Sequence, residues 1–239
     1  FTVLTTTANR SLPSADIQDE VPVYRVWIDP ASWWSKAIGT LRVTWRFVNA
    51  RRRFSIMHLH GFSQKSMLLV CLAMVARKRI GIKLTSVGHD DPVAIADRGH
   101  WASWCYTKAE AYFAVSPRLV ELYRAAGLPP ARVRLIPNGV DLERFRPPAD
   151  GERELLRREL SISGRGAVVL FVGFFSRDKR PDLLFDAWAA VSAVAPDSVL
   201  LFVGATRSPY YEVDAQLAAA VRHRAAALGV TEHLRFIEA

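Results

Sequence analysis

The sequence predicts an α/β protein with two mostly parallel sheets. Short apolar runs rich in branched side chains alternate with amphipathic stretches of helical length along nearly the whole chain, a pattern typical of βαβ units. The alternation pauses once, at Val133–Phe145, where an apolar strand runs into a proline and then the turn-forming pair Asn138-Gly139. We interpret this segment as the hinge between a first domain at residues 1–147 and a second at residues 148–239. An ordinary turn inside one domain is the alternative.

The composition is that of a basic globular protein. The 239 residues carry a formal net charge of +9, and the 50% that are hydrophobic suffice for one large or two small cores. Between Pro30 and His89 there is no Asp or Glu, although this stretch is rich in Lys and Arg. One face of the first half should therefore attract phosphates, anionic lipid or nucleic acid. Cys71 and Cys105 are expected to be buried free thiols, as in a reducing cytoplasm, and not a metal site.

The first half should alternate strands with helices. The strands are expected at Phe1–Thr7, Val21–Ile28, Phe54–His60, Ile82–Val87, Phe113–Val115 and Val133–Ile136, and the helices at Trp33–Arg53, Ser63–Lys78, Trp101–Tyr112 and Arg118–Ala126. Ser116 and Pro117 suit the N-cap and the first position of the last of these helices. Residues 9–20 are expected to be a polar loop. The first strand has nothing before it to pair with, so we expect the chain to begin inside a domain.

The helix predicted at Trp33–Arg53 carries a single apolar stripe. Its members recur at spacings of three and four residues and are Trp34, Ile38, Leu41, Trp45 and Val48. We expect this stripe to pack on the core, with arginines beside it. A second hypothesis, compatible with the first, is that this basic helix lies on an anionic membrane surface. Trp33 and Phe47, which fall off the stripe, would then contact lipid.

Polar residues follow the strands of the first half at the point where each strand ends. They are His58, His60, His89, Asp90, Ser116 and Asn138. In parallel sheets ligands bind at the carboxyl ends of the strands, so these side chains should share one edge of the sheet. A single histidine at such a place is usually structural, but several polar residues together indicate a site.

The second half restarts the alternation. Strands are expected at Ala167–Val172, Ser198–Val203 and Leu234–Ile237, and helices at Glu152–Leu160, Asp182–Val194 and Asp214–Leu228. The first of these strands is continuously apolar, as in a strand buried on both faces.

A basic loop follows that strand. Gly173 ends the strand, Arg177 and Lys179 lie in the loop, and a helix begins directly afterwards. A glycine turn, two cations and a helix N-terminus together predict an anion pocket; the alternative is a solvated basic loop. The loop is neither a Walker loop nor GxGxxG, which argues against a dinucleotide oxidoreductase.

Four stretches of the chain resemble the family 4 glycosyltransferases, which are retaining enzymes of the GT-B fold with two Rossmann-like domains facing a cleft. Their order and spacing fit nearly the whole chain. They are the strand at 54–61, with Ser55 where the family usually has Asp, the strand ending in His at 84–90, the Ile-Pro-Asn-Gly-Val-Asp signature within 133–145, and the strand, loop and helix at 169–188. The third stretch is the most specific.

The resemblance implies a donor, a UDP-sugar or GDP-sugar, bound by the second domain and an acceptor bound by the first, with no metal and no cofactor. His89 would match the histidine that reaches the donor sugar, which makes it the candidate catalytic residue. The diphosphate would be bound by Lys179, Arg177 and Gly173. The acceptor side of the cleft would be lined by His60, Asp90, Ser116 and Asn138.

The sequence also departs from the family pattern. Phe174 stands where the family usually has Arg directly after the loop glycine, and Arg177 is the candidate substitute. The family's Gly-rich loop after the first strand is absent, and its Glu-x7-Glu motif would lie beyond residue 239. We therefore expect an internal fragment, with an incomplete second domain, that need not be active alone.

The leading hypothesis is a cytoplasmic glycosyltransferase, peripheral on the inner face of the plasma membrane. It would transfer a sugar with retention to a lipid-linked or polysaccharide acceptor of the cell envelope. The second hypothesis, favoured by Phe174, is a non-catalytic sugar-nucleotide-binding or scaffold protein of the same fold. Nucleic-acid binding is disfavoured, because the basic residues lack the pattern of base-stacking aromatics found in known modules.

Overall fold

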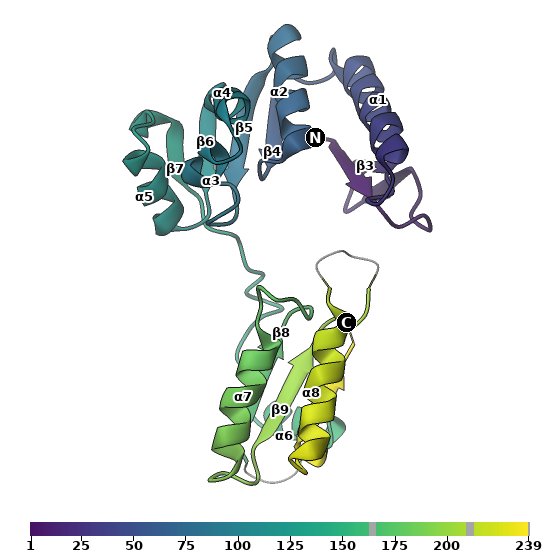
Figure 1. Ribbon diagram of the computed structural model, residues 1–239, viewed down its shortest axis with the longest axis vertical. Coiled ribbons are helices and arrows are strands. Elements are labelled where there is room, and N and C mark those ends of the chain that lie inside the picture. The colour runs from purple at the N-terminus through teal and green to yellow at the C-terminus, as the bar shows by residue number, and fades with distance from the viewer. Residues whose placement is uncertain (163–165, 209–212, 239) are drawn as a thin grey trace. The chain divides into compact units, whose positions relative to one another are not determined.

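The chain folds into two compact units, Phe1–Leu142 and Glu143–Ala239, as shown by a computed structural model (Figure 1). The structure describes residues 1–162, 166–208 and 213–238. The division falls five residues before the boundary placed after residue 147 from the sequence. Each unit has its own hydrophobic core, so each is described by itself.

The elements of unit 1 follow the predicted order closely. The strands are β1 (Val3–Thr7), β2 (Ala15–Gln18), β3 (Val21–Trp27), β4 (Ile56–His60), β5 (Arg79–Leu84), β6 (Ala111–Ala114) and β7 (Val133–Leu135). The helices are α1 (Trp33–Ala50), α2 (Gln64–Val75), α3 (Pro92–Ala96), α4 (His100–Thr107) and α5 (Pro117–Ala125), with a 3₁₀ turn at Pro130–Arg132. β2, α3 and the 3₁₀ turn were not predicted, and the helix predicted at Trp101–Tyr112 is too long, because α4 ends at Thr107 and β6 begins at Ala111. β2 is a fully exposed strand within the polar segment, and α3 is a single short turn of helix.

Unit 1 contains two sheets. In the order β4-β5-β6-β7 all neighbours are parallel, whereas in β1-β3-β2 the last pair is antiparallel. β5 begins three residues earlier than the predicted Ile82. The reason is that Arg77 has a positive φ of 54° and ends α2, and the Lys78 amide then donates to the Ala73 carbonyl. The turn after α2 is therefore complete before Arg79, and β5 begins at that residue.

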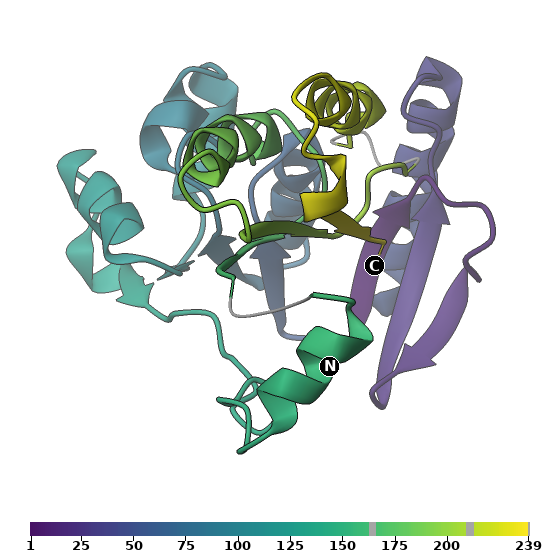
Figure 2. The same cartoon turned by 90° about the horizontal axis from the view of Figure 1, so that it is seen from below.

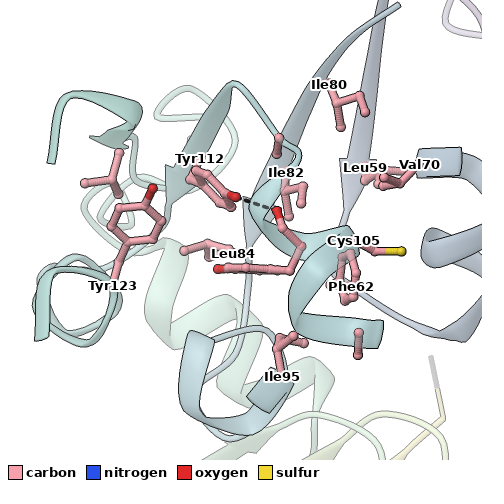
Figure 3. Packing of buried hydrophobic residues seen from close by; sticks show 14 of the residues in the cluster. Leu59, Phe62, Val70, Ile80, Ile82, Leu84, Ile95, Cys105, Tyr112 and Tyr123 are labelled. Carbon is pink, nitrogen blue, oxygen red and sulfur yellow. Dashed lines mark hydrogen bonds between the residues drawn. The ribbon is translucent and has the colours of Figure 1, made fainter. Parts of the chain in front are cut away.

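The core of unit 1 lies between the four-stranded sheet and its helices (Figure 3). Ile82 and Leu84 of β5 are fully buried in it. Three tyrosines form a contiguous group beside them, Tyr106, Tyr112 and Tyr123, and the Tyr112 hydroxyl donates to the Tyr106 carbonyl at 2.5 Å. The strands of this sheet are thus held firmly from one face, which fixes where their ends lie.

The expectation that the apolar stripe of α1 packs on the core is wrong. The buried residues of α1 are Gly39, Val43 and Phe47, and Val43 packs against Ile28. All members of the stripe are exposed. Gly39 explains the choice of face, because a Cβ there would lie 2.6 Å from the Ile28 side chain. The helix can approach the sheet closely only through this side, which turns the stripe outward.

Unit 2 contains a parallel sheet of order β10-β9-β8. Its elements are α6 (Glu152–Glu159), β8 (Val168–Val172), α7 (Pro181–Ser192), β9 (Val199–Val203), α8 (Ala215–Ala227), a 3₁₀ turn at Thr231–His233 and β10 (Leu234–Ile237). Seen from below, α7 and α8 lie together on one side of these strands (Figure 2). Phe175, Phe185 and Trp188 pack there with Leu200 and Phe202.

β8 is not buried on both faces as its apolar sequence suggested. Val169 and Phe171 pack against the core, whereas Leu170 and Val172 alternate to the other face and are 55% and 72% exposed. β8 is also an edge strand of the described sheet.

Among the described residues, no helix is long and apolar enough to cross a membrane.

Candidate functional site

The carboxyl ends of the four parallel strands of unit 1 bring most of the predicted polar residues to one edge. His60 is the last residue of β4, and the Thr85–Asp91 segment follows β5. Ser116 follows β6 and is the N-cap of α5, and Asn138 lies just past β7. His60, the His89 side chain and Asn138 are exposed, and Ser116 is half-buried.

Asp90 differs from the other candidates because it is 5% exposed. Its carboxylate accepts hydrogen bonds from the Phe62 amide at 2.8 Å, the Thr85 amide at 3.1 Å and the Thr85 hydroxyl at 2.5 Å. The Tyr106 hydroxyl donates to the Asp90 carbonyl at 3.2 Å. The carboxylate therefore joins the turns that follow β4 and β5 and positions them, since its acceptor sites are turned inward.

Two further residues hold the His89 turn. Arg98 donates to the His89 carbonyl at 2.6 Å and to the Phe62 carbonyl at 2.5 Å, so one guanidinium spans both turns. Asp91 accepts from the Gly88 amide at 2.5 Å and caps α3 through the amides of Val93 and Ala94. The backbone of His89 is thus fixed on both sides while its imidazole faces solvent.

Sequence reasoning missed both of these residues. Asp91 was recognisable, because Asp followed by Pro is a usual start for a helix. Nothing in the sequence around Arg98 indicates which carbonyls its guanidinium binds, since they lie 36 and nine residues earlier in the chain.

A second histidine lies beside His60. The His58 and His60 rings, on the same face of β4, have centroids 4.9 Å apart, and Phe113 packs edge-on against His58. Burial lowers the pKa of His58 below its ordinary value, and the positive charges of His60 and Lys83 lower it further. Burial and these neighbours thus favour the neutral imidazole of His58 over its charged form.

In unit 2 the loop after β8 lies at the carboxyl end of the sheet. The Gly173 amide donates to the Val203 carbonyl at 2.9 Å, which joins the ends of β8 and β9. Gly204 follows β9 with a φ of +139°, and a Cβ there would lie 2.2 Å from the Gly173 carbonyl oxygen. The two strand ends can approach this closely only because position 204 has no side chain.

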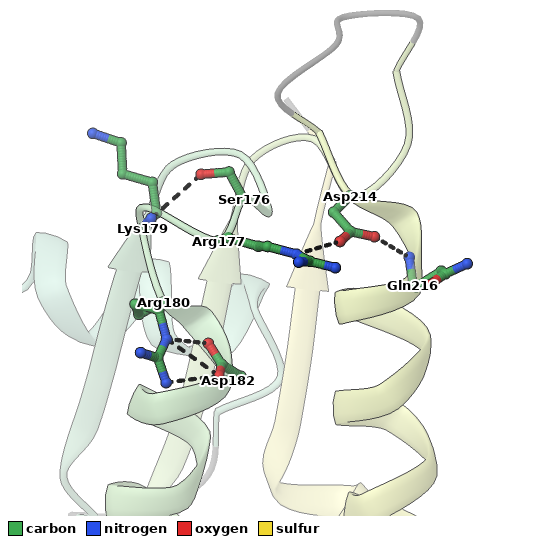
Figure 4. Close-up of polar contacts among 7 residues, drawn as sticks. All are labelled: Ser176, Arg177, Lys179, Arg180, Asp182, Asp214 and Gln216. Atoms are coloured by element: carbon green, nitrogen blue, oxygen red, sulfur yellow. Dashed lines mark hydrogen bonds and ion pairs between the residues drawn. The ribbon is translucent and has the colours of Figure 1, made fainter. Parts of the chain in front are cut away.

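Lys179 lies in this loop, directly before α7 (Figure 4). The buried hydroxyl of Ser176 accepts from the Lys179 amide at 3.3 Å, and the Ser176 carbonyl accepts from the Arg180 amide at 3.2 Å. Arg180 has a positive φ of 49° and pairs with Asp182 at 3.1 Å. The Lys179 ammonium forms no ion pair with any residue in the described parts of the chain, and Figure 4 shows it extending outward. This cation is available to a ligand.

Arg177 points away from Lys179, toward α8 (Figure 4). Its Nε lies 3.5 Å from Asp214 Oδ2, and Asp214 also caps α8 by accepting from the Gln216 amide at 3.0 Å. These residues line an open depression of about 520 Å³. The structure therefore places Gly173, Arg177 and Lys179 on one loop but separates the two cations, since Arg177 points toward Asp214 and Lys179 extends outward. Within residues 1–162, 166–208 and 213–238, no three His, Cys, Asp or Glu side chains form a group that could hold a metal ion.

The amino-acid sequence matches one family model, described as a glycosyl transferase 4-like domain, over residues 1–139. Among curated proteins, the chain is 36% identical over 163 residues to a D-inositol 3-phosphate glycosyltransferase of Salinispora tropica. That alignment covers 65% of this chain and 30% of the relative. Across the curated relatives, the matched part covers between 17% and 34% of the relative's length.

Among solved structures, the chain is similar to Anabaena Alr3699/HepE, crystallised in complex with UDP-glucose. The TM-score is 0.69 at 17% identity, over 92% of this chain and 56% of the other. A UDP-GlcNAc 2-epimerase from Neisseria meningitidis, bound to UDP-GlcNAc, matches with a TM-score of 0.53 at 9% identity, over 100% and 72% of the two chains. These similarities confirm the GT-B type of fold, with an incomplete second domain. They do not select a reaction, because the fold carries more than one.

Proposed function

The chain belongs to the glycosyl transferase 4-like family, and from this premise we propose that the protein transfers a sugar from a UDP-sugar to an acceptor with retention of configuration. A uridine donor is preferred to a guanosine donor because Alr3699/HepE was crystallised with UDP-glucose. The donor would bind to unit 2 and the acceptor to unit 1. His89 is proposed to contact the donor sugar, and His60, Asp90, Ser116 and Asn138 to form or support the acceptor side.

The observation that carries this proposal is the Lys179 ammonium, which extends outward from the loop that leads into α7 and pairs with no carboxylate in the described parts of the chain. The leaving group in sugar transfer from such a donor is a nucleoside diphosphate, which gains negative charge as the bond to the sugar breaks. A fixed cation and a helix N-terminus stabilise that charge without a metal. Arg177 would add a second cation after leaving Asp214, since an ion pair this exposed contributes little free energy.

The acceptor is proposed to be lipid-linked or a polysaccharide, and the enzyme to work at the inner, cytoplasmic face of the plasma membrane. The acid-free basic segment between Pro30 and His89 supports this assignment. The free thiols of Cys71 and Cys105 are consistent with a reducing compartment. A phosphorylated inositol is the second candidate acceptor, suggested by the name of the Salinispora tropica relative.

The proposal is tested with the complete protein by measuring release of nucleoside diphosphate from UDP-sugars and GDP-sugars, with glycolipid, glycan or inositol phosphate as acceptor. Proton NMR of the product gives the anomeric configuration. Lys179→Ala should lower kcat/KM, and the loss should correspond to about 2–4 kcal/mol of transition-state stabilisation. Lys179→Arg should retain part of the activity. Arg158→Ala, which removes an exposed cation from α6, is the matched control and should be neutral.

Unchanged kcat/KM in Lys179→Ala would contradict the role given to this lysine. Binding of UDP-sugar without turnover for any acceptor would instead favour the non-catalytic alternative, to which Phe174 already points. His89→Ala should abolish transfer while leaving the fold intact, because Arg98 binds the backbone of residue 89 and not its side chain. His100→Ala, at the exposed start of α4, is the control for that variant.

A further inference from the structure

The outer surface of α1 is apolar along its length. An α-helix turns about 100° per residue, so Trp34, Leu41 and Trp45 lie roughly opposite the core-facing Val43. They are 64%, 70% and 59% exposed, and Trp33 stacks on Trp34 with ring centroids 3.8 Å apart. Contiguous apolar surface on this scale marks an interaction site, whereas single exposed side chains do not.

One border of this surface is basic. Arg42 and Arg46 lie together on one side of the apolar residues, and Arg51, Arg52 and Arg53 follow the C-terminal end of the helix. None of these arginines forms an ion pair within the described residues. The Arg46 guanidinium instead lies over the rings of Tyr24 and Trp45, at 5.0 and 5.3 Å from their centroids. The surface therefore combines exposed tryptophans with uncompensated positive charge.

We propose that this face of α1, together with the arginines that follow the helix (Arg51, Arg52 and Arg53), docks unit 1 onto a bilayer that contains anionic lipid. Tryptophan side chains prefer the boundary between headgroups and acyl chains, and arginines bind the lipid phosphates. The 18-residue helix would lie along the surface, about 27 Å long. The expectation that Phe47 contacts lipid is wrong, because Phe47 is buried against the core. The lipid-contacting residues are Trp33, Trp34, Ile38, Leu41 and Trp45.

Charge argues against a second copy of the chain as the occupant. A symmetric pair formed through this face would bring two acid-free basic surfaces together, and like charges repel. An anionic bilayer satisfies both the apolar residues and the arginines. The inference concerns a partner of unit 1, and it does not depend on sugar transfer.

Co-sedimentation of the complete protein with vesicles tests the proposal. Vesicles of phosphatidylcholine with phosphatidylglycerol should bind the protein, whereas pure phosphatidylcholine should not, and high salt should weaken binding. Trp45→Ser and Leu41→Ser should each reduce binding about tenfold or more, since each removes apolar contact with the bilayer. Trp101→Ser is the matched control, because Trp101 on α4 is as exposed as Trp45, at 59%.

Arg42→Gln should lower affinity for the anionic vesicles, and Arg124→Gln, at an exposed position on α5, should not. Equal binding to neutral and anionic vesicles, or full binding by Trp45→Ser, would overturn the proposal. A change in oligomeric state in Trp45→Ser without vesicle binding would assign the face to a protein partner instead. Transfer to a soluble acceptor should be unaffected by Trp45→Ser, which separates failure of this proposal from failure of the proposed function.

Discussion

At the scale of single residues, the site in unit 1 depends on groups that do not themselves face a ligand. Asp90 is the clearest case, because its buried carboxylate accepts three hydrogen bonds that join the turn after β4 to the turn after β5. A carboxylate in this position acts through the geometry of its neighbours. His89 directly precedes Asp90, so its position is fixed by the hydrogen bonds of the Asp90 carboxylate and by the bond from Arg98 to the His89 carbonyl.

Asp90→Asn should destabilise the protein by about 1–3 kcal/mol. The amide side chain keeps the shape but replaces one acceptor oxygen with a donor, which leaves a buried donor facing the amide of Phe62 or Thr85. Chemical denaturation followed by circular dichroism measures the change. Asp97→Asn, at an exposed position at the end of α3, is the control and should stay within experimental error of the parent protein.

His58 gives unit 1 a pH-dependent stability. Its pKa in the folded protein lies below the ordinary value of 6.5, so the unfolded chain takes up the proton first as the pH falls. The free energy of unfolding should therefore decrease as the pH drops from about 6.5 toward the folded pKa, and this decrease should be absent above that window.

Thermal unfolding at about pH 7.5 and about pH 5 tests this prediction. The parent protein should lose more stability between the two conditions than His58→Gln, which cannot be protonated at this position. His100→Gln should behave like the parent. An identical loss in His58→Gln and the parent would show that other groups dominate the pH dependence.

At the scale of elements, the order of strands and helices could be predicted from the sequence. Which side of each element faces the core and which faces solvent could not. The sequence predicted α2, α5, α7 and α8 nearly to their ends, because helix length, caps and end signals depend only on neighbours along the chain. The predicted orientation of α1 was wrong, because the prediction assigned the apolar stripe to the core. The actual contact is decided by Gly39 and Ile28, two residues whose close approach the period of apolar residues does not reveal.

Gly204→Ala should strongly disrupt unit 2. Its Cβ would lie 2.2 Å from the Gly173 carbonyl, so the ends of β8 and β9 would have to separate, and the loop carrying Lys179 would move with them. Gly229→Ala is the matched control, since Gly229 also has a positive φ, +68°, but no atom lies within 4 Å of the added Cβ.

The control should cost about 1–2 kcal/mol from the left-handed backbone alone. Gly204→Ala should cost clearly more in chemical denaturation. Similar losses in the two variants would show that backbone conformation, and not the contact with Gly173, accounts for the effect.

At the scale of the whole molecule, the two units are joined by an exposed segment. Residues 134–151 are exposed throughout, and residues 136–150 contain no helix or strand. Such segments are where proteases cut first. Each unit has its own core, so each should remain folded after a cut here.

Limited trypsin digestion should therefore cleave first after Arg144, giving fragments 1–144 and 145–239 by mass spectrometry. Arg146 should resist, because a proline follows it. Arg144→Gln should slow the first cleavage. A first cut inside α1 or between β8 and α7 would contradict the division into two independently folded units.

The candidate site was predictable to the extent that it depends on strand ends. The positions of His60, His89, Ser116 and Asn138 follow from the rule that parallel strands end at the same edge. The burial of Asp90 and the role of Arg98 could not be predicted, because hydrogen bonds between separate turns leave no periodic signal. The separation of Arg177 from Lys179 could not be predicted either, because Arg177 contacts Asp214, which caps a helix much later in the chain.

The distribution of tryptophan has a practical consequence for watching the two units separately. Trp188 is the sole tryptophan between residues 143 and 239 of the sequence, and it is 2% exposed in the core of unit 2. The indoles of α1 belong to unit 1 and face water. Iodide should therefore quench the exposed indoles of unit 1, those of α1 together with Trp101 and Trp104 of α4, and spare Trp188. One fluorescence spectrum, recorded with and without quencher, would then report melting of unit 2 through Trp188. Lipid contact of unit 1 would appear as a smaller quenched fraction, because only the indoles of α1 become protected.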